Sequence, residues 1–468
     1  MPCQTIPETL RDRFSGVSTR IPLLHGEDAI YINFDNAAST PPLHAVQSGV
    51  DRFVEYYASV HRGTGFKSQL STWAYETARA ATLRFVDADP AERTCIFVKN
   101  STEAINKLAH RLNLEPDDVI LTTVMEHHSN DLPFRAVAET VHIDVCPDGS
   151  LDEDDFDRKL TQYSDRVRLV SISGASNVTG FLNPVRRLAA KSHAAGAYFM
   201  VDSAQLAPHR TIHIGALDEP DHFDFIALSA HKMYAPYGTG ALIGRTDVFS
   251  HGDPDLRGGG TVDIVTLDDV VWADTPERDE AGSPNVVGAV ALALAIRELT
   301  EIGMDVVAQH ETELTAYALE TLSQVPDVHI FGDTNPTRAH ERLGVIPFLL
   351  EGKSHFLVSA ILGYEFGIGV RAGCFCAHPY LLRLLDVDTE AARRVREKMV
   401  AGDRRDIPGL IRISFGLYNT TEEIDRLAQA LEAIQRGDYQ GRYTQDASSG
   451  EYRPEGWAPD FNSYFPLA

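Results

Sequence analysis

A lysine in a small-residue segment is the first candidate for covalent chemistry. Lys232 lies within residues 229–240, directly after an apolar run at 223–228 that predicts a short buried strand. A lysine in an apolar setting has a lowered pKa and becomes a usable amine nucleophile, whereas an arginine stays protonated. Taken alone, this segment fits a surface lysine after a strand equally well.

A cysteine in a glycine-containing loop is the second candidate. Cys376 ends the stretch Arg371-Ala-Gly-Cys-Phe-Cys, which follows a strand-like run at 367–371. A free cysteine is usually a small buried hydrophobe, but a thiolate in an accessible loop is a nucleophile. The five cysteines do not suggest a disulfide scaffold in a chain this long, and they favour a reducing cytoplasm.

Alternating strands and helices must position these residues. Strands are predicted near 95–98, 118–123, 141–145, 167–173, 198–202, 223–228 and 240–244. Helices lie between most of them, so the sequence predicts βαβ units and an α/β fold with a mainly parallel, doubly wound sheet. Ligands of such sheets bind beyond the carboxyl ends of the strands.

Polar residues follow these strands at the expected ligand-binding edge. They are Ser101-Thr102 at the start of a helix, Glu126-His127-His128, Ser176-Asn177, Asp202-Ser203-Ala204-Gln205 and the Lys232 segment. Hydroxyls and backbone N–H groups at a helix start can receive an anion, although ordinary helix capping is the better explanation of Ser101 and Thr102 when they are taken alone.

Composition excludes some classes of protein. The chain has 468 residues with 43% hydrophobic and 23% charged residues, as in ordinary globular proteins. A formal net charge of −25 argues against a nucleic-acid partner. The N-terminus shows no secretory signal, and the longest strongly apolar segment, 286–296, is too short to span a membrane.

The sequence also predicts a division into two domains and an extension. We expect a large domain over residues 30–290, with helices from Pro41 to about 58 and over 71–86. A smaller α+β domain would combine 1–29 with 291–436, using helices at 286–302, 306–325 and 421–435 and strands at 342–350 and 367–371. An insertion near 382–407 would contain a solvated helix at 389–400, and the tail 437–468 would be a loose arm or pack across a partner.

Ten short segments together reveal a family resemblance over residues 35–431. They are Asp35-Asn-Ala-Ala, Val60-His-Arg-Gly, Ser101-Thr-Glu, Glu126-His-His-Ser-Asn, Ser176-Asn, Val201-Asp-Ser-Ala-Gln, Ser229-Ala-His-Lys, Glu280-Ala-Gly-Ser-Pro-Asn, Arg371-Ala-Gly-Cys-Phe-Cys and Arg412 before Tyr418-Asn-Thr. The chain resembles fold-type I, pyridoxal-phosphate (PLP) enzymes of the class V aminotransferase group. Within that group it is most similar to SufS-type cysteine desulfurases and selenocysteine lyases.

The resemblance implies how the cofactor would be held. Lys232 would form a Schiff base with PLP and move protons at the substrate Cα, Asp202 would pair with the pyridine nitrogen, and Gln205 would bond the ring hydroxyl side. His127, rather than His128, would stack on the ring. The expected phosphate ligands are Ser101, Thr102, Ser229, His231 and, from the neighbouring subunit of a homodimer, Ser283. No further Cys, His or Asp cluster at ligand spacing accompanies the two histidines, so no metal site is predicted there.

The resemblance also implies a substrate and a sulfur acceptor. Asn36, Asn177 and Arg412 would position the amino acid, with Asn177 also touching the cofactor; an arginine fork suits a carboxylate. Cys376 would take the substrate sulfur as a persulfide and leave alanine. The loop departs from the SufS pattern because Cys374-Phe375 replaces the usual His-His. The resulting sequence Gly-Cys-Phe-Cys resembles the corresponding loop of molybdenum-cofactor sulfurases. Cys374 would then be a second sulfur carrier, a resolving thiol or a space filler.

Three functions remain open at this point. The first is a PLP-dependent cysteine desulfurase that also uses selenocysteine and passes sulfur to an acceptor protein. The second is a class V aminotransferase, epimerase or C–S lyase in which Cys376 is not catalytic, because a fold does not fix a function. The third is a sulfur-relay or interaction protein without turnover, against which the Lys232–Asp202 pair argues.

Overall fold

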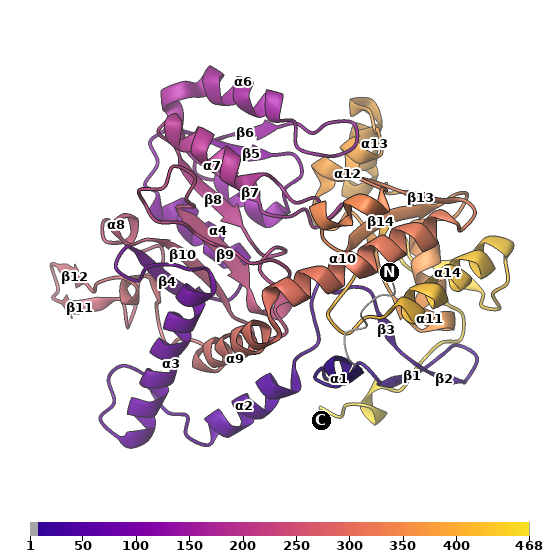
Figure 1. Cartoon of the computed structure of the whole chain (residues 1–468), viewed down its shortest axis with the longest axis horizontal. Coiled ribbons are helices and arrows are strands. Elements are labelled where there is room, and N and C mark those ends of the chain that lie inside the picture. Colours follow the sequence, from indigo (N-terminus) through magenta and orange to yellow (C-terminus); the bar gives the residue numbers. More distant parts are fainter. Residues whose placement is uncertain (1–7, 468) are drawn as a thin grey trace.

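A seven-stranded sheet forms the centre of the molecule, shown in Figure 1 as a computed structural model that describes residues 8–467. In spatial order its strands are β4 (Arg93–Val98), β10 (Gly240–Arg245), β9 (Phe225–Ser229), β8 (Tyr198–Asp202), β7 (Val167–Ser173), β5 (Val119–Thr123) and β6 (Glu139–Ile143). The pairings from β9 to β6 are parallel, whereas β10 runs antiparallel to both its neighbours. The predicted α/β fold with a mainly parallel sheet is confirmed.

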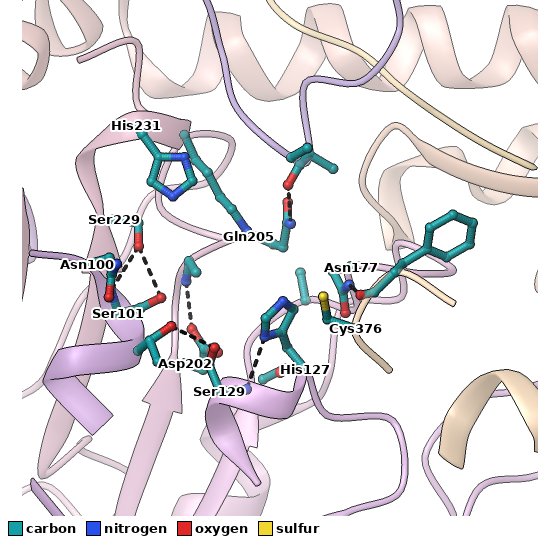
Figure 2. A pocket seen from close by; sticks show the side chains of 18 of the residues that line it. Asn100, Ser101, His127, Ser129, Asn177, Asp202, Gln205, Ser229, His231 and Cys376 are labelled. Carbon is teal, nitrogen blue, oxygen red and sulfur yellow. Dashed lines mark hydrogen bonds between the residues drawn. The ribbon is translucent and has the colours of Figure 1, made fainter. Parts of the chain in front are cut away.

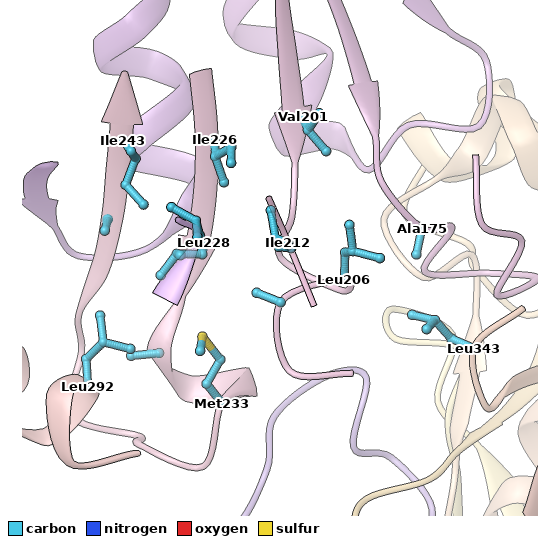
Figure 3. Packing of buried hydrophobic residues seen from close by; sticks show 14 of the residues in the cluster. Ala175, Val201, Leu206, Ile212, Ile226, Leu228, Met233, Ile243, Leu292 and Leu343 are labelled. Carbon is cyan, nitrogen blue, oxygen red and sulfur yellow. The ribbon is translucent and has the colours of Figure 1, made fainter. Parts of the chain in front are cut away.

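Both faces of this sheet are buried, as parallel sheets require. Side chains alternate between faces along a strand, so Ile226 and Leu228 of β9 join one apolar cluster while Phe225 joins another. Figure 3 shows Ile226, Leu228 and Ile243 packed in the first cluster with Leu292 of α9 (Val286–Ile302). The strands therefore form from largely apolar runs, although β7 contains Arg168 and Ser171.

Helices surround the central sheet. They are α2 (His44–Val54), α3 (Phe66–Phe85), α4 (Ser101–Arg111), α5 (Leu132–Arg135), α6 (Glu153–Tyr163), α7 (Val185–Ala194), α8 (Thr246–Phe249) and α9. α9 packs against α2 and α3, and α4 lies against β9 and β10. A hairpin of β11 (Val262–Val265) and β12 (Val270–Trp272) projects from this part of the molecule (Figure 1).

A second apolar core lies under a four-stranded antiparallel sheet in the C-terminal half. Its strand order is β13 (Val328–Ile330), β14 (Val345–Leu350), β17 (Leu410–Ser414) and β16 (Arg371–Gly373). The helices α10 (Met304–Ser323), α11 (His355–Phe366) and α14 (Thr421–Arg436) pack with it. Ile32 and Phe34, at and just after β3 (Ile32–Asn33), belong to this core, because β3 pairs with β15 (Ile368–Gly369). The division into a large and a small domain stays a prediction.

Several element boundaries differ from the sequence prediction. The helix after Pro41-Pro42 is α2, which ends at Val54 rather than near 58, and α3 begins at Phe66 rather than at 71. The side chain of Phe66 is 71% exposed, so the first turn of α3 has no apolar periodicity by which the sequence could reveal it. β14 begins at Val345 rather than at 342, since Arg342 is a buried loop residue whose guanidinium donates to the carbonyl of Val345.

The insertion and the tail take defined positions. α12 (His378–Leu384) is followed by α13 (Thr389–Val400), which has no buried residue and is the solvated helix that the sequence predicts. The tail forms a hairpin of β18 (Tyr443–Gln445) and β19 (Tyr452–Pro454). The carboxylate of Glu365 on α11 accepts hydrogen bonds from the backbone N–H of Gln440 and Gly441, so this part of the tail packs on its own chain rather than forming a loose arm.

The remaining short elements lie near the N-terminus. They are α1 (Glu8–Arg11) and a hairpin of β1 (Arg20–Pro22) and β2 (Asp28–Ile30). Among the described residues, no helix combines the length and apolar character needed to cross a membrane.

Candidate active site

A cavity opens where the carboxyl ends of the parallel strands face the C-terminal half of the chain. It encloses about 870 Å³ including its open mouth. Eleven of the thirteen residues predicted for the site line it: Ser101, Thr102, His127, Asn177, Asp202, Gln205, Ser229, His231, Lys232, Cys376 and Arg412. Figure 2 shows Ser101 and Ser229 on one side of the cavity, with Asn177 and Cys376 on the other.

Lys232 and Asp202 reach this cavity from adjacent strands. Asp202 is the last residue of β8, and Lys232 lies in the short 3-10 turn Ala230–Lys232 that follows β9. Burial lowers the pKa of the Lys232 amine to about 8, although Asp202 opposes this shift. Lys232 Nζ makes no hydrogen bond or ion pair with any described residue, so the amine is available to a ligand.

Asp202 is a buried carboxylate with spare acceptor capacity. Its Oδ1 accepts a hydrogen bond of 3.0 Å from the N–H of Ala204, and burial raises the pKa of the carboxyl group. Only 5% of the residue is exposed, and that surface faces the cavity. A carboxylate in this position favours a protonated nitrogen opposite it, because burial leaves its charge poorly solvated.

Hydroxyl groups gather at the start of α4. The hydroxyl of Ser229 donates to the hydroxyl of Ser101 (3.0 Å), and the two hydroxyls of Thr102 and Ser129 are 2.7 Å apart. Asn100 caps the helix by accepting from the N–H of Glu103. The helix N-terminus adds a partial positive charge, so this end of the cavity is suited to a phosphate.

The three histidines near the cavity have different settings. His127 Nδ1 accepts a hydrogen bond from the N–H of Ser129, and burial lowers the His127 pKa to about 3, so its ring is neutral. Burial also lowers the pKa of His231 to about 4. His128 does not line the cavity, because its ring stacks on His378 with 5.0 Å between the centroids.

Cys376 lies in a tight turn on the opposite wall. Phe375 and Cys376 adopt positive φ angles of 53° and 56°, and the N–H of Ala377 donates to the carbonyl of Cys374. Two hydrogen bonds of 2.7 Å tie the turn to the segments that follow β7 and β5: the Asn177 amide donates to the Phe375 carbonyl, and the His128 N–H donates to the Cys376 carbonyl. Cys376 is exposed, whereas Cys374 is half-buried and burial raises its pKa.

Arg412 is the buried cation of the cavity. Its guanidinium donates to Asp35 Oδ1 (3.0 Å) and to the carbonyl of Asn177 (2.9 Å), and it lies over the Phe375 ring at 4.8 Å. The Nε atom is buried without a partner among the described residues. Asp35 also contacts Arg371, so two arginines converge on one carboxylate beside the cavity.

Asn36 and Ser283 are not brought to the cavity of this chain. Asn36 is 2% exposed, and its amide donates to the carbonyls of Asn33 and Ser414 and accepts from the hydroxyl of Tyr418. These contacts join β3 to β17, and Asn36 does not line the cavity, so its substrate-positioning role stays a prediction. Ser283 is exposed in a loop that lines separate hollows.

Sequence reasoning did not assign roles to several residues that line the cavity. They are Asn100, Ser129, Ser173, Arg371 and Phe375. All except Ser173 are next to a residue with a predicted role or lie within one of the ten segments, so position in a motif is the available signal. Ser173 is the last residue of β7, and its position at the carboxyl end of a parallel strand is the only sign. The side-chain amide of Gln205 donates to the carbonyl of Ala37 (2.9 Å), and this contact fixes the direction in which the Gln205 side-chain oxygen points.

Comparisons with known proteins agree with this architecture. Residues 32–427 match the family model described as "Aminotransferase class-V". A probable cysteine desulfurase of Halalkalibacterium halodurans is 35% identical over 417 residues, which cover 87% of this chain and 94% of that protein. A cysteine desulfurase of Pectobacterium atrosepticum is 36% identical over 426 residues, covering 88% and 95%.

Solved structures give the same result. The apo structure of a cysteine desulfurase from Thermococcus onnurineus NA1 matches with a TM-score of 0.78 and 31% identity, covering 93% of this chain and 100% of that one. The cysteine desulfurase CsdA from Escherichia coli matches with a TM-score of 0.75 and 27% identity, covering 93% and 99%. The resemblance drawn from the ten segments is confirmed, and the chain belongs to the class V aminotransferase family.

Proposed function

We propose that this protein is a PLP-dependent cysteine desulfurase. It would convert L-cysteine to alanine and transfer the sulfur to Cys376, which becomes a persulfide; selenocysteine is a second substrate of the same chemistry. One observation supports this most: a lysine of lowered pKa, a buried aspartate and an exposed cysteine line the same cavity. Relatives about 35% identical over most of the chain bear the name cysteine desulfurase.

The cavity has the donors that PLP needs. The hydroxyls of Ser101, Thr102 and Ser229 with the ring of His231 would hold the phosphate at the start of α4. Asp202 would pair with the ring nitrogen, and His127 would lie against the ring face. When bound, PLP withdraws electrons from the substrate Cα, which weakens the bonds around that atom.

The chain's own groups would do the remaining work. Arg412 would bind the substrate carboxylate with its planar fork, and Lys232 Nζ would move the proton at the substrate Cα. The Cys376 thiolate would attack the substrate sulfur, so that the new S–S bond forms as the substrate's C–S bond breaks. The products are alanine and the Cys376 persulfide, with no oxidant required.

We further propose a homodimer in which Ser283 completes the phosphate site of the partner. The exposed position of Ser283 supports this, as do exposed apolar side chains on nearby α3 and on the β11–β12 hairpin. These are Phe66, Trp73, Ile264, Val265 and Val271. The persulfide would pass its sulfur to an acceptor protein, which can approach because the turn at Cys376 is exposed.

The decisive assay measures alanine and sulfide formed from L-cysteine in the presence of a thiol reductant. The parent protein should form both in equal amounts, and Cys376→Ala should lose at least about 100-fold in rate while keeping the absorbance of bound PLP. Cys374→Ser is the matched control and should keep most of the activity. If Cys376→Ala reacts at the parent rate, or if only another amino acid is consumed, the desulfurase proposal is wrong and a different class V activity replaces it.

A further inference from the structure

Two histidines and an aspartate meet at the amino ends of β8 and β9, at the edge of the sheet opposite the cavity. His193 Nε2 lies 2.9 Å from Asp224 Oδ2, and His222 Nε2 lies 3.2 Å from Asp224 Oδ1. The two imidazole rings stack with 4.1 Å between centroids and 19° between planes. All three ligand-type atoms lie within 4.8 Å of one another.

The other nitrogen of each ring also faces an oxygen. His193 Nδ1 is 2.8 Å from the carbonyl of Pro220, and His222 Nδ1 is 2.6 Å from the carbonyl of Glu219. A carbonyl oxygen only accepts hydrogen bonds, so each Nδ1 must bear the hydrogen. Each Nε2 then either bears a second proton or presents a lone pair toward Asp224.

The stacked rings therefore turn both Nε2 atoms toward one carboxylate. A divalent cation between these atoms would meet two imidazole nitrogens and a carboxylate oxygen. The guanidinium of Arg245 also lies 3.3 Å from Asp224 Oδ1.

We propose that His193, His222 and Asp224 bind a divalent cation of the Zn²⁺ type. Two imidazole nitrogens and one carboxylate oxygen are a donor set that Zn²⁺ accepts, with water as the fourth ligand. The Nδ1–H groups that donate to carbonyls would orient both rings, as the outer hydrogen bonds of metal-bound histidines do. The N···O separations of 2.9 and 3.2 Å are close to those between two ligands of one zinc ion.

The surroundings permit a cation at this position. Arg245 has a better partner in Asp247, with which it makes hydrogen bonds of 2.6 and 3.0 Å, so its longer contact with Asp224 can be given up. The side chain of His193 is 18% exposed, which leaves a path for the ion from solvent. Asp224 Oδ2 accepts one hydrogen bond from the N–H of Phe199, and its second lone pair is available to the ion.

The site would join two separate pieces of the chain. His193 lies near the end of α7, His222 lies in the loop before β9, and Asp224 precedes β9 directly. The bound ion would therefore stabilise this corner of the fold, and it lies at the other end of the strands from the proposed reaction.

Zinc binding by the PLP-loaded, full-length protein tests this site. After incubation with Zn²⁺ and gel filtration, we expect His222→Phe and His193→Gln each to retain about one zinc ion per chain less than the parent. His329→Phe is the matched control, because His329 forms an exposed pair with Glu351 and no third ligand joins them among the described residues, so its zinc content should equal that of the parent. Equal zinc content in the parent and both site variants would overturn the proposal.

X-ray absorption of the zinc-loaded parent needs no variant and distinguishes this site from the thiols of the cavity. A first shell of nitrogen and oxygen with two imidazoles is the expected result. Sulfur in the first shell, or no retained zinc, would show that these residues do not form the site. Zn²⁺ should also raise the melting temperature of the parent but not that of His222→Phe.

Discussion

Lys232 and Cys376 reach one cavity from regions with opposite backbone properties. Lys232 directly follows β9, a fully buried strand paired on both sides, and Asp202 ends the adjacent strand. Cys376 is exposed in a turn in which Phe375 and Ala377, on either side of it, are buried. Phe375 and Cys376 have positive φ, a conformation that costs non-glycine residues about 1–3 kcal/mol each.

This difference fits the two tasks we propose. An amine that moves a proton at a fixed carbon needs a rigid position, because proton transfer depends on short, well-aligned contacts. A thiol that takes sulfur inside the cavity and presents it to an acceptor outside needs a segment that can move. The contacts of the turn with Asn177 and His128 hold it next to the cavity without burying Cys376.

Removal of the amine should give the largest effect. We expect Lys232→Ala to lose at least about 1,000-fold in alanine formation, since no other group can replace its covalent role. Unlike Cys376→Ala, it should also lose the visible absorbance of covalently attached PLP. Lys191→Ala, which removes a surface lysine paired with Asp157, is the control and should keep both activity and absorbance. If Lys232→Ala retained the absorbance, Lys232 would not be the residue that binds PLP covalently, and the contrast between the lysine and cysteine regions would be wrong.

Substitution of the arginine between the two regions should have an intermediate effect. Arg412→Lys replaces a planar fork by a single ammonium group, so we expect kcat/KM for cysteine to fall about 10- to 100-fold. Asp35→Asn keeps the Arg412 guanidinium and removes only the ion pair between residues 35 and 412, so it should change kcat/KM less. Steady-state kinetics with unchanged PLP absorbance would check this, and equal losses in the two variants would contradict a direct role for Arg412.

The pH dependence of PLP attachment tests the pKa of Lys232, and therefore the lysine region alone. Because burial lowers the pKa of Lys232 to about 8, the neutral amine should become common as the pH rises through 8. We expect the rate of PLP attachment to cofactor-free protein to rise about tenfold from pH 7 to pH 9 and then to level off. Rapid-mixing absorbance would follow it. A rate still rising steeply above pH 9 would mean that the amine titrates as an ordinary lysine.

The smallest effect on catalysis should come from Asn36. Its side chain makes buried hydrogen bonds between β3 and β17, so Asn36→Ala should lower the free energy of unfolding by about 1–3 kcal/mol. The KM for cysteine of the folded variant should stay within about twofold of the parent, because the residue does not line the cavity. Urea denaturation and kinetics check both points, with the exposed Asn462→Ala as control. A large rise in KM with unchanged stability would instead support the predicted substrate-positioning role of Asn36.

Much of the fold could be predicted from local patterns. The strands of the central sheet are short, largely apolar runs, and all seven occur close to the predicted positions. α13 was predictable because its charged residues recur at helical spacing. The start of α3 at Phe66 was not, because an exposed first turn leaves no apolar period to detect.

The tail shows why other parts could not be predicted. Its anchor is the carboxylate of Glu365, about 75 residues earlier in the chain, which accepts from the backbone N–H of Gln440. A backbone donor is the same in every residue type except proline, so the sequence of the tail contains no sign of its partner.

The sequence by itself determined the order of the strands along the chain, the residues at their carboxyl ends and the family to which those residues belong. These depend on the types of neighbouring residues, which the chain states directly. Only the tertiary structure decided that Asn36 joins two strands, that Asp35 pairs with Arg412, and that His193 and His222 share Asp224. Such contacts depend on which distant backbone segments lie side by side, and packing of the whole chain determines that.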